Sequence, residues 1–108
     1  MSAGESSTIY AEQVVIKESE IAIASKDQSN THLQDGLLTN NKLAFTAFQK
    51  KPEYGVASII ATAIKMNHNQ LGHLIEKGSA LHLNGQEMPT ANKVKERMYG
   101  VEFGASSQ

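Results

Sequence analysis

The stretch VASIIATAIKMNHNQLGHLIEK, residues 56–77, carries the strongest pattern in this chain of 108 residues. Residues 56–64 are apolar on most sides when drawn as a helix, which is typical of a helix buried at the centre of a domain. Asn67 is a good N-cap for a second helix over residues 68–77, and Gly78 is a good residue to end it. The pattern predicts two helices packed at the centre of the domain.

Further helices are expected on both sides of this stretch. Leu38, Phe45 and Phe48 lie on one apolar stripe at helical spacing, and Pro52 ends that helix because it lacks an N–H and its ring disfavours continuation. On the other side, residues 91–99 predict a final amphipathic helix.

Three shorter segments predict other structure. The β-branched runs 14–16 and 21–23 fit a hairpin or a short helix, and their composition favours extended structure. Asn84-Gly85 predicts a two-residue hairpin turn within residues 81–88, and Asp35-Gly36 marks another turn. No internal repeat is evident. The expected fold class is therefore mainly α: a small domain of about four helices, with a helix-turn-helix-like pair and one or two short β-hairpins.

Charge is distributed unevenly along the chain. Residues 1–35 carry −4 and residues 36–108 carry +3, for a net charge of −1. We expect an acidic N-terminal arm or hairpin with a linker at 1–35, a helical domain at 36–103 and a disordered tail at 104–108. A positive C-terminal part suggests a polyanionic partner, although an ordinary solvated surface explains the same charge.

Composition excludes several classes of site. The chain has no cysteine, which excludes disulfides, thiolate metal sites and cysteine nucleophiles and favours a reducing cytoplasm. No signal peptide and no span long enough to cross a membrane is visible. His68 and His73 are five positions apart, which does not place them together on one helix face. No nucleophile elbow or phosphate loop occurs, so we expect neither enzymatic activity nor a metal or other cofactor.

The two central helices have suitable residues for a bipartite DNA-binding motif. Ala61 is the small residue where the helices would cross, Met66 is the apolar turn residue, and Leu71 and Leu74 would face inward. Asn67 and Gln70 form a capping-box pattern. Over residues 57–77 this arrangement resembles the motif of helix-turn-helix regulators. Lys65, where those families commonly have glycine, and Gly72 in the second helix depart from it.

The resemblance implies a sequence-specific DNA-binding protein of the transcriptional-regulator type, acting as a homodimer. Asn and Gln side chains pair with adenine, His donates to guanine, and Lys holds phosphates. The implied DNA-binding residues are Lys65, His68, Asn69, Gln70, His73 and Lys77.

A second hypothesis is a non-enzymatic protein-interaction module, such as an adaptor, a secretion-system component or an inhibitor. It would act through helical surfaces and through the apolar N-terminal segment 14–23, which would add to a partner protein or to a second copy.

Overall fold

The computed structural model describes residues 1–49, 55–94 and 96, and these residues form two β-sheets. The mainly α fold class predicted from the sequence is wrong. The strands are β1 (Ser2–Ala3), β2 (Thr8–Lys17), β3 (Ile21–Lys26), β4 (Asn30–Thr39), β5 (Leu43–Phe48), β6 (Ser58–Asn67), β7 (Leu71–Ile75), β8 (Ala80–Leu83) and β9 (Gln86–Glu87).

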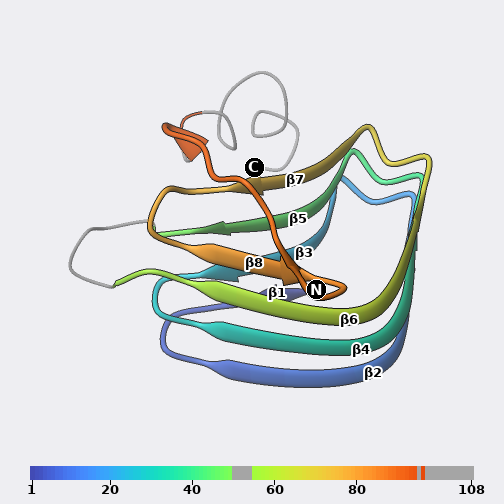
Figure 1. Ribbon diagram of the computed structural model, residues 1–108, viewed down its shortest axis with the longest axis horizontal. Helices are drawn as coiled ribbons and strands as arrows, with labels where there is room; N and C mark the ends of the chain where they lie inside the picture. The colour runs from blue at the N-terminus through green and yellow to red at the C-terminus, as the bar shows by residue number, and fades with distance from the viewer. Residues whose placement is uncertain (50–54, 95, 97–108) are drawn as a thin grey trace.

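The chain winds as a parallel β-solenoid (Figure 1). Sheet A has the strand order β1-β3-β5-β7, and sheet B has the order β2-β4-β6-β8-β9. From β1 to β8, successive strands along the chain alternate between the two sheets, so each strand pairs with one from the next turn of the winding. We call these turns coil 1 (β2 and β3), coil 2 (β4 and β5), coil 3 (β6 and β7) and coil 4 (β8).

The register reveals a repeat that is interrupted once. Thr8 pairs with Asn30, 22 positions further on, and Asn30 pairs with Ser58, 28 positions further on. Ser58 then pairs with Ala80, again 22 positions further on. Six extra positions therefore lie between β5 and β6, and they shift the third coil out of a constant period.

The core lies between the two sheets and is built from rows of equivalent residues. One row contains Thr31 of coil 2, Ile59 of coil 3 and Leu81 of coil 4, each at most 1% exposed. Along β6, buried residues alternate with exposed ones, as expected for a strand with one face on a core. Burying one Ile or Leu side chain stabilises a fold by about 1.5–3 kcal/mol, so these rows hold the coils together.

Coils 1 to 3 turn at equivalent residues with left-handed backbone. In the long strands this residue is Gln13, Asp35 or Ala63, with φ between 55° and 61°, and the strands bend sharply (Figure 1). A second set lies where the chain leaves sheet B for sheet A. Its members are Glu18, Asn40 and His68.

An asparagine ladder fixes the second of these corners. The N–H of Ser19 donates to Oδ1 of Asn41 at 2.9 Å, and the N–H of Asn41 donates to Oδ1 of Asn69 at 3.0 Å. The Asn69 amide also donates to the carbonyl of Leu38. Buried polar groups must be paired, and here the pairing joins three coils.

The C-terminal end of the solenoid is covered by the chain that follows β8. The hairpin at Asn84-Gly85 pairs β9 with β8. The N–H of Ala91 then donates to the carbonyl of Ile75 at 2.7 Å, at the end of β7. Val94 is fully buried in a cluster with β5 and β7.

The central helix pair predicted over 56–77 is replaced by β6, a corner and β7. Ile60 and Ala63 point away from the core although they are apolar, and this hides the alternation of the strand. The apparent cap at Asn67 is the last residue of β6, and Leu71 and Leu74 lie in β7. A helix-turn-helix at 57–77 and a small helical domain are therefore excluded.

The other local predictions have mixed outcomes. The extended structure favoured for 14–16 and 21–23 is confirmed, although these runs lie in different sheets and form no hairpin with each other. The Asn84-Gly85 hairpin is also confirmed. The helix predicted before Pro52 is wrong, because Leu43–Phe48 is strand β5, and Pro52 lies outside the described residues. Most of the helix predicted over 91–99 lies outside them too.

Candidate functional site

The residues predicted to bind DNA do not form a common face. His68, Asn69 and Gln70 lie together at the corner between β6 and β7. Lys65 is exposed in β6, whereas His73 is half-buried in sheet A, opposite Phe45. Lys77 lies beyond the far end of β7, where its N–H donates to the carbonyl of Ala91. The structure has no helix over 57–77, so these six side chains are not presented by a recognition helix as the resemblance implied.

Asn69 also has little capacity left for a ligand. Its Oδ1 accepts hydrogen bonds from the main-chain N–H and from the side-chain amide of Asn41, both at 3.0 Å. Its own amide donates to Leu38. This side chain therefore holds the corner between coils.

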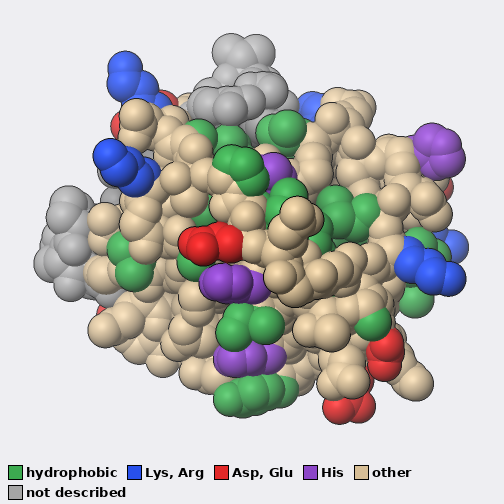
Figure 2. Space-filling view, viewed as in Figure 1, with side chains coloured by type: hydrophobic (Ala, Val, Ile, Leu, Met, Phe, Trp, Pro, Cys, Tyr) green, Lys and Arg blue, Asp and Glu red, His purple; other side chains and the backbone are tan. Residues whose placement is uncertain are grey.

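A column of side chains runs along the outer face of sheet B. The register places Tyr10, His32, Ile60 and His82 in one row across four strands. The rings of Tyr10 and His32 stack, with centroids 4.7 Å apart and planes inclined by 14°. Figure 2 shows this column of hydrophobic and histidine side chains crossing the face and ending at the edge formed by β2. Tyr10 is thus the last member of the column at the first coil, and one face of its ring is exposed.

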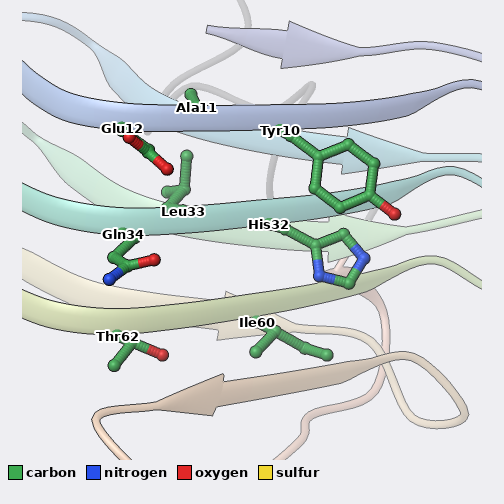
Figure 3. A pocket seen from close by; sticks show the side chains of 8 residues that line it. All are labelled: Tyr10, Ala11, Glu12, His32, Leu33, Gln34, Ile60 and Thr62. Atoms are coloured by element: carbon green, nitrogen blue, oxygen red, sulfur yellow. The ribbon is translucent and has the colours of Figure 1, made fainter.

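A second, polar row lies beside this column. Glu12, Gln34 and Thr62 are in register on β2, β4 and β6. Together with Tyr10, His32 and Ile60 of the column they line a depression on the outer face (Figure 3). The outer face of sheet B therefore presents the aromatic ring of Tyr10 and the carboxylate of Glu12 on β2, and the amide of Gln34 on β4.

The outer edge of β2 has main-chain groups that point away from the solenoid. In a strand, the N–H and C=O groups of alternate residues point to opposite sides. The carbonyl of Ser7 accepts from the N–H of Asn30, so the groups of Ile9 and Ala11 point toward β4 and those of Thr8, Tyr10 and Glu12 point outward. β2 pairs only with β4 among the described residues.

The same alternation holds beyond the bend at Gln13. Ile64 is equivalent to Val14 through the register, and its N–H and C=O groups bond to the side chain of Asn84 in the following coil. The groups of Val14 accordingly point toward β4, and those of Val15 and Lys17 point outward. We call the outward groups of Thr8, Tyr10, Glu12, Val15 and Lys17 the open edge.

Apolar side chains are also incompletely covered at this end. Ile9, Ala11, Val14 and Ile16 point inward but are only half-buried. Their counterparts in coil 2 include Leu33 and Leu38, which are 4% and 1% exposed. On the outer face of β2, Tyr10 is 76% exposed and Val15 is 62% exposed. The first coil therefore has inward-facing apolar side chains like those of an internal coil, but no further coil of the described residues packs over them.

Acidic side chains surround the open edge. Glu5, Glu12 and Glu18 are exposed in or beside β2, and the one basic side chain of that strand is Lys17. Glu5, Glu12 and Glu18 are thus three of the six acidic residues that give residues 1–35 their −4 charge.

Other kinds of site are not evident in the part of the chain that the structure describes. It contains no cluster of three or more His, Asp or Glu side chains arranged to hold a metal ion. Nor does it contain a helix with the length and apolarity needed to cross a membrane.

The open edge and the column that ends on it were not predicted from the sequence. The available signal was the equivalence of Tyr10 and His32 and of Ser19 and Asn41 at a spacing of 22 residues. Comparisons of the chain with protein-family models, with curated proteins and with solved structures found no match.

Proposed function

We propose that this chain is a non-enzymatic polypeptide-binding module, in which the open edge of β2 pairs with an extended segment of another protein. The observation that carries the proposal is the contrast between the two ends of the solenoid. Residues 86–94 cover the C-terminal end, whereas the first coil leaves both main-chain groups and apolar side chains uncovered. Exposed strand edges are templates for strand addition, and solenoids require a cap where no partner covers the end.

A different polypeptide fits this edge better than a second copy of the chain. β1 already pairs with the outer side of β3, through Ser2 with Ala24 and Ala3 with Ser25. If two first coils stacked face to face, β1 of one copy would occupy the layer that β3 of the other copy requires. A single extended strand meets no such obstacle, because β1 leaves the whole of β2 free. A homodimer formed through β2 is therefore the alternative against which peptide binding is tested.

Peptide titration of the ¹⁵N-labelled chain tests the proposal. The probe is a synthetic peptide with the sequence of β2, TIYAEQVVIK, carrying Glu12→Lys. The control is the same peptide with prolines at alternate positions, which cannot pair. We expect the amide resonances of Thr8–Lys17 to shift with the first peptide and not with the second. The proposal is wrong if neither the probe nor the unmodified β2 peptide shifts them, or if light scattering shows a dimer that Val15→Pro, on the outer side of β2, dissociates.

We expect the chain to be cytoplasmic, because small secreted domains are usually stabilised by disulfide bonds and this chain has no cysteine.

A further inference from the structure

The structure also points to the chemistry of the bound segment, an inference that rests on the proposed function. We infer that the segment runs parallel to β2, with an aromatic side chain stacked on Tyr10 and a basic side chain, two residues later, facing Glu12. The residue between them is apolar and covers the half-buried inward side chains of the first coil.

The direction follows from the neighbouring layer. Among the described residues, β1 is the strand that already lies outside coil 1, and it runs parallel to β3. All strand pairs from β1 to β8 are parallel, and only the capping strand β9 is antiparallel. A parallel strand on β2 would therefore have the same direction as the other strand pairs from β1 to β8, and it would lie in the same layer as β1.

The aromatic position follows from the stack. One face of the Tyr10 ring packs on His32 at 4.7 Å, and the side chain is still 76% exposed. In parallel sheets equivalent side chains align in rows, with strands about 4.8 Å apart, so the next side chain in this row meets the second face of the ring. Stacked aromatic pairs add about 0.5–1.5 kcal/mol beyond the area that they bury. An aromatic residue extends the column by one member.

The basic position follows from charge. Glu12 is exposed at the outer end of its row, and its neighbour there, Gln34, is uncharged. Opposite charges on adjacent strands are favourable and like charges are unfavourable. Glu5 and Glu18 are exposed on either side, so a basic segment is attracted to this edge and an acidic one is repelled.

The apolar position between them follows from the alternation of side chains. A residue between the aromatic and the basic one points to the inner face of sheet B, in the row that begins with Ala11. Ala11 is half-buried, whereas Leu33 and Ala61, next in that row, are at most 4% exposed. An apolar side chain at this position completes the cover of the row.

Three peptides that differ at two positions test the aromatic and the basic position. The first is the β2 peptide with Glu12→Lys, which places Tyr on Tyr10 and Lys opposite Glu12 in parallel register. The second carries Tyr10→Ala in addition, and the third is the unmodified β2 sequence. We expect the first peptide to bind at least tenfold more tightly than either of the others. Equal affinity within threefold, with shifts still at β2, overturns the inferred chemistry and leaves strand binding intact.

A charge swap, taken together with the Tyr10→Ala peptide, tests direction and register. The chain variant Glu12→Lys faces the Glu of the unmodified peptide in the parallel register, and it does so too in an antiparallel pairing centred on Glu12, where the peptide Tyr lies opposite Val14. Only the parallel register also places the peptide Tyr on Tyr10, so the loss of affinity with the Tyr10→Ala peptide distinguishes the two directions. We expect this variant to reverse the preference, binding the unmodified peptide more tightly than the Lys peptide. If the order of affinities stays unchanged, the parallel register is wrong. If no peptide shifts the resonances of either chain, the proposed function itself fails.

Discussion

Oδ1 of Asn69 accepts two hydrogen bonds from Asn41, one from its main-chain N–H and one from its side-chain amide, both at 3.0 Å. The two residues occupy the same corner of successive coils. Asn41 in turn accepts the N–H of Ser19 and donates to the carbonyl of Ile16 at 3.2 Å. One side chain that is 1% exposed therefore bonds with the coils on both sides of its own.

Replacing Asn41 with alanine should destabilise the fold substantially. The change leaves the N–H of Ser19 and the carbonyl of Ile16 without their partner, and an unpaired buried polar group costs about 1–3 kcal/mol. We expect the free energy of unfolding in urea to fall by about 2–4 kcal/mol. Gln70→Ala, at an exposed neighbour in the same corner, should change it by less than about 0.5 kcal/mol. Equal effects of the two substitutions contradict the ladder.

Gly36 is a position where the coils approach too closely for a side chain. A Cβ there lies 3.0 Å from Cδ1 of Ile64 and 3.1 Å from the carbonyl oxygen of Val14. We expect Gly36→Ala to lower the free energy of unfolding by about 1–3 kcal/mol, because a packed core accommodates added volume poorly. Adding Ile64→Val, which removes the contacting methyl group, should recover part of that loss.

Gly72 provides the matched control for this prediction. A Cβ at Gly72 meets only the end of the Met66 side chain, at 3.5 Å, which is an ordinary contact. Gly72→Ala should leave stability unchanged or raise it slightly, because alanine restricts the unfolded chain. A larger loss at Gly72 than at Gly36 in thermal denaturation argues against the stacking of coils described here.

The C-terminal cover of the solenoid should contribute to stability through Val94. This side chain is fully buried against Leu43, Phe48 and Leu74. We expect Val94→Ala to cost about 1–3 kcal/mol, through lost burial and the cavity that remains. Val56, which is 48% exposed, is the control, and Val56→Ala should have little effect. If calorimetry finds Val94→Ala as mild as Val56→Ala, residues 86–94 do not cap this end.

Prolines at two adjacent residues of β2 should separate folding from binding. The N–H of Val14 points toward β4 and that of Val15 points outward, and proline removes this group. We expect Val14→Pro to destabilise the chain by at least about 2 kcal/mol. Val15→Pro should leave the fold nearly as stable and lower peptide affinity at least tenfold. Urea unfolding and peptide titration of both variants measure this, and unaltered binding by Val15→Pro contradicts the open edge.

Features with local causes could be predicted from the sequence. Residues 14–16 and 21–23 are β-branched, and the turn at Asn84-Gly85 requires positive φ at both residues, at 51° and 85° here. In each case the preference of a few neighbouring residues agrees with the final structure. The extended segments and the hairpin were therefore predictable.

The winding itself depends on contacts between residues 22 or 28 positions apart, which local patterns do not contain. Thr8 and Asn30 reveal the period of 22, but the six extra positions before Ser58 break it. Asn and His tolerate left-handed backbone better than most residues, but neither Asn40 nor His68 stands in an Asn-Gly or Asp-Gly pair that would mark the corner. Because Ile60 and Ala63 point outward, β6 resembles a helix, and the helix-turn-helix interpretation followed from that resemblance.

The candidate site was hidden for a related reason. Tyr10 becomes significant only when it stacks on His32, and β2 becomes an edge only when the order of strands is known. The acidic charge of residues 1–35 was visible, but the placement of Glu5, Glu12 and Glu18 in or beside one open strand was not.

Amide hydrogen exchange along β2, resolved by residue, tests the central claim most directly. In the free chain we expect fast exchange at Thr8, Tyr10, Glu12, Val15 and Lys17. Slow exchange is expected at Ile9, Ala11 and Val14, whose N–H groups point toward β4. Saturation with the Glu12→Lys peptide should slow the first group at least tenfold and leave the second unchanged. Protection of the first group in the free chain, or no change on adding the peptide, would contradict an open edge that binds a strand.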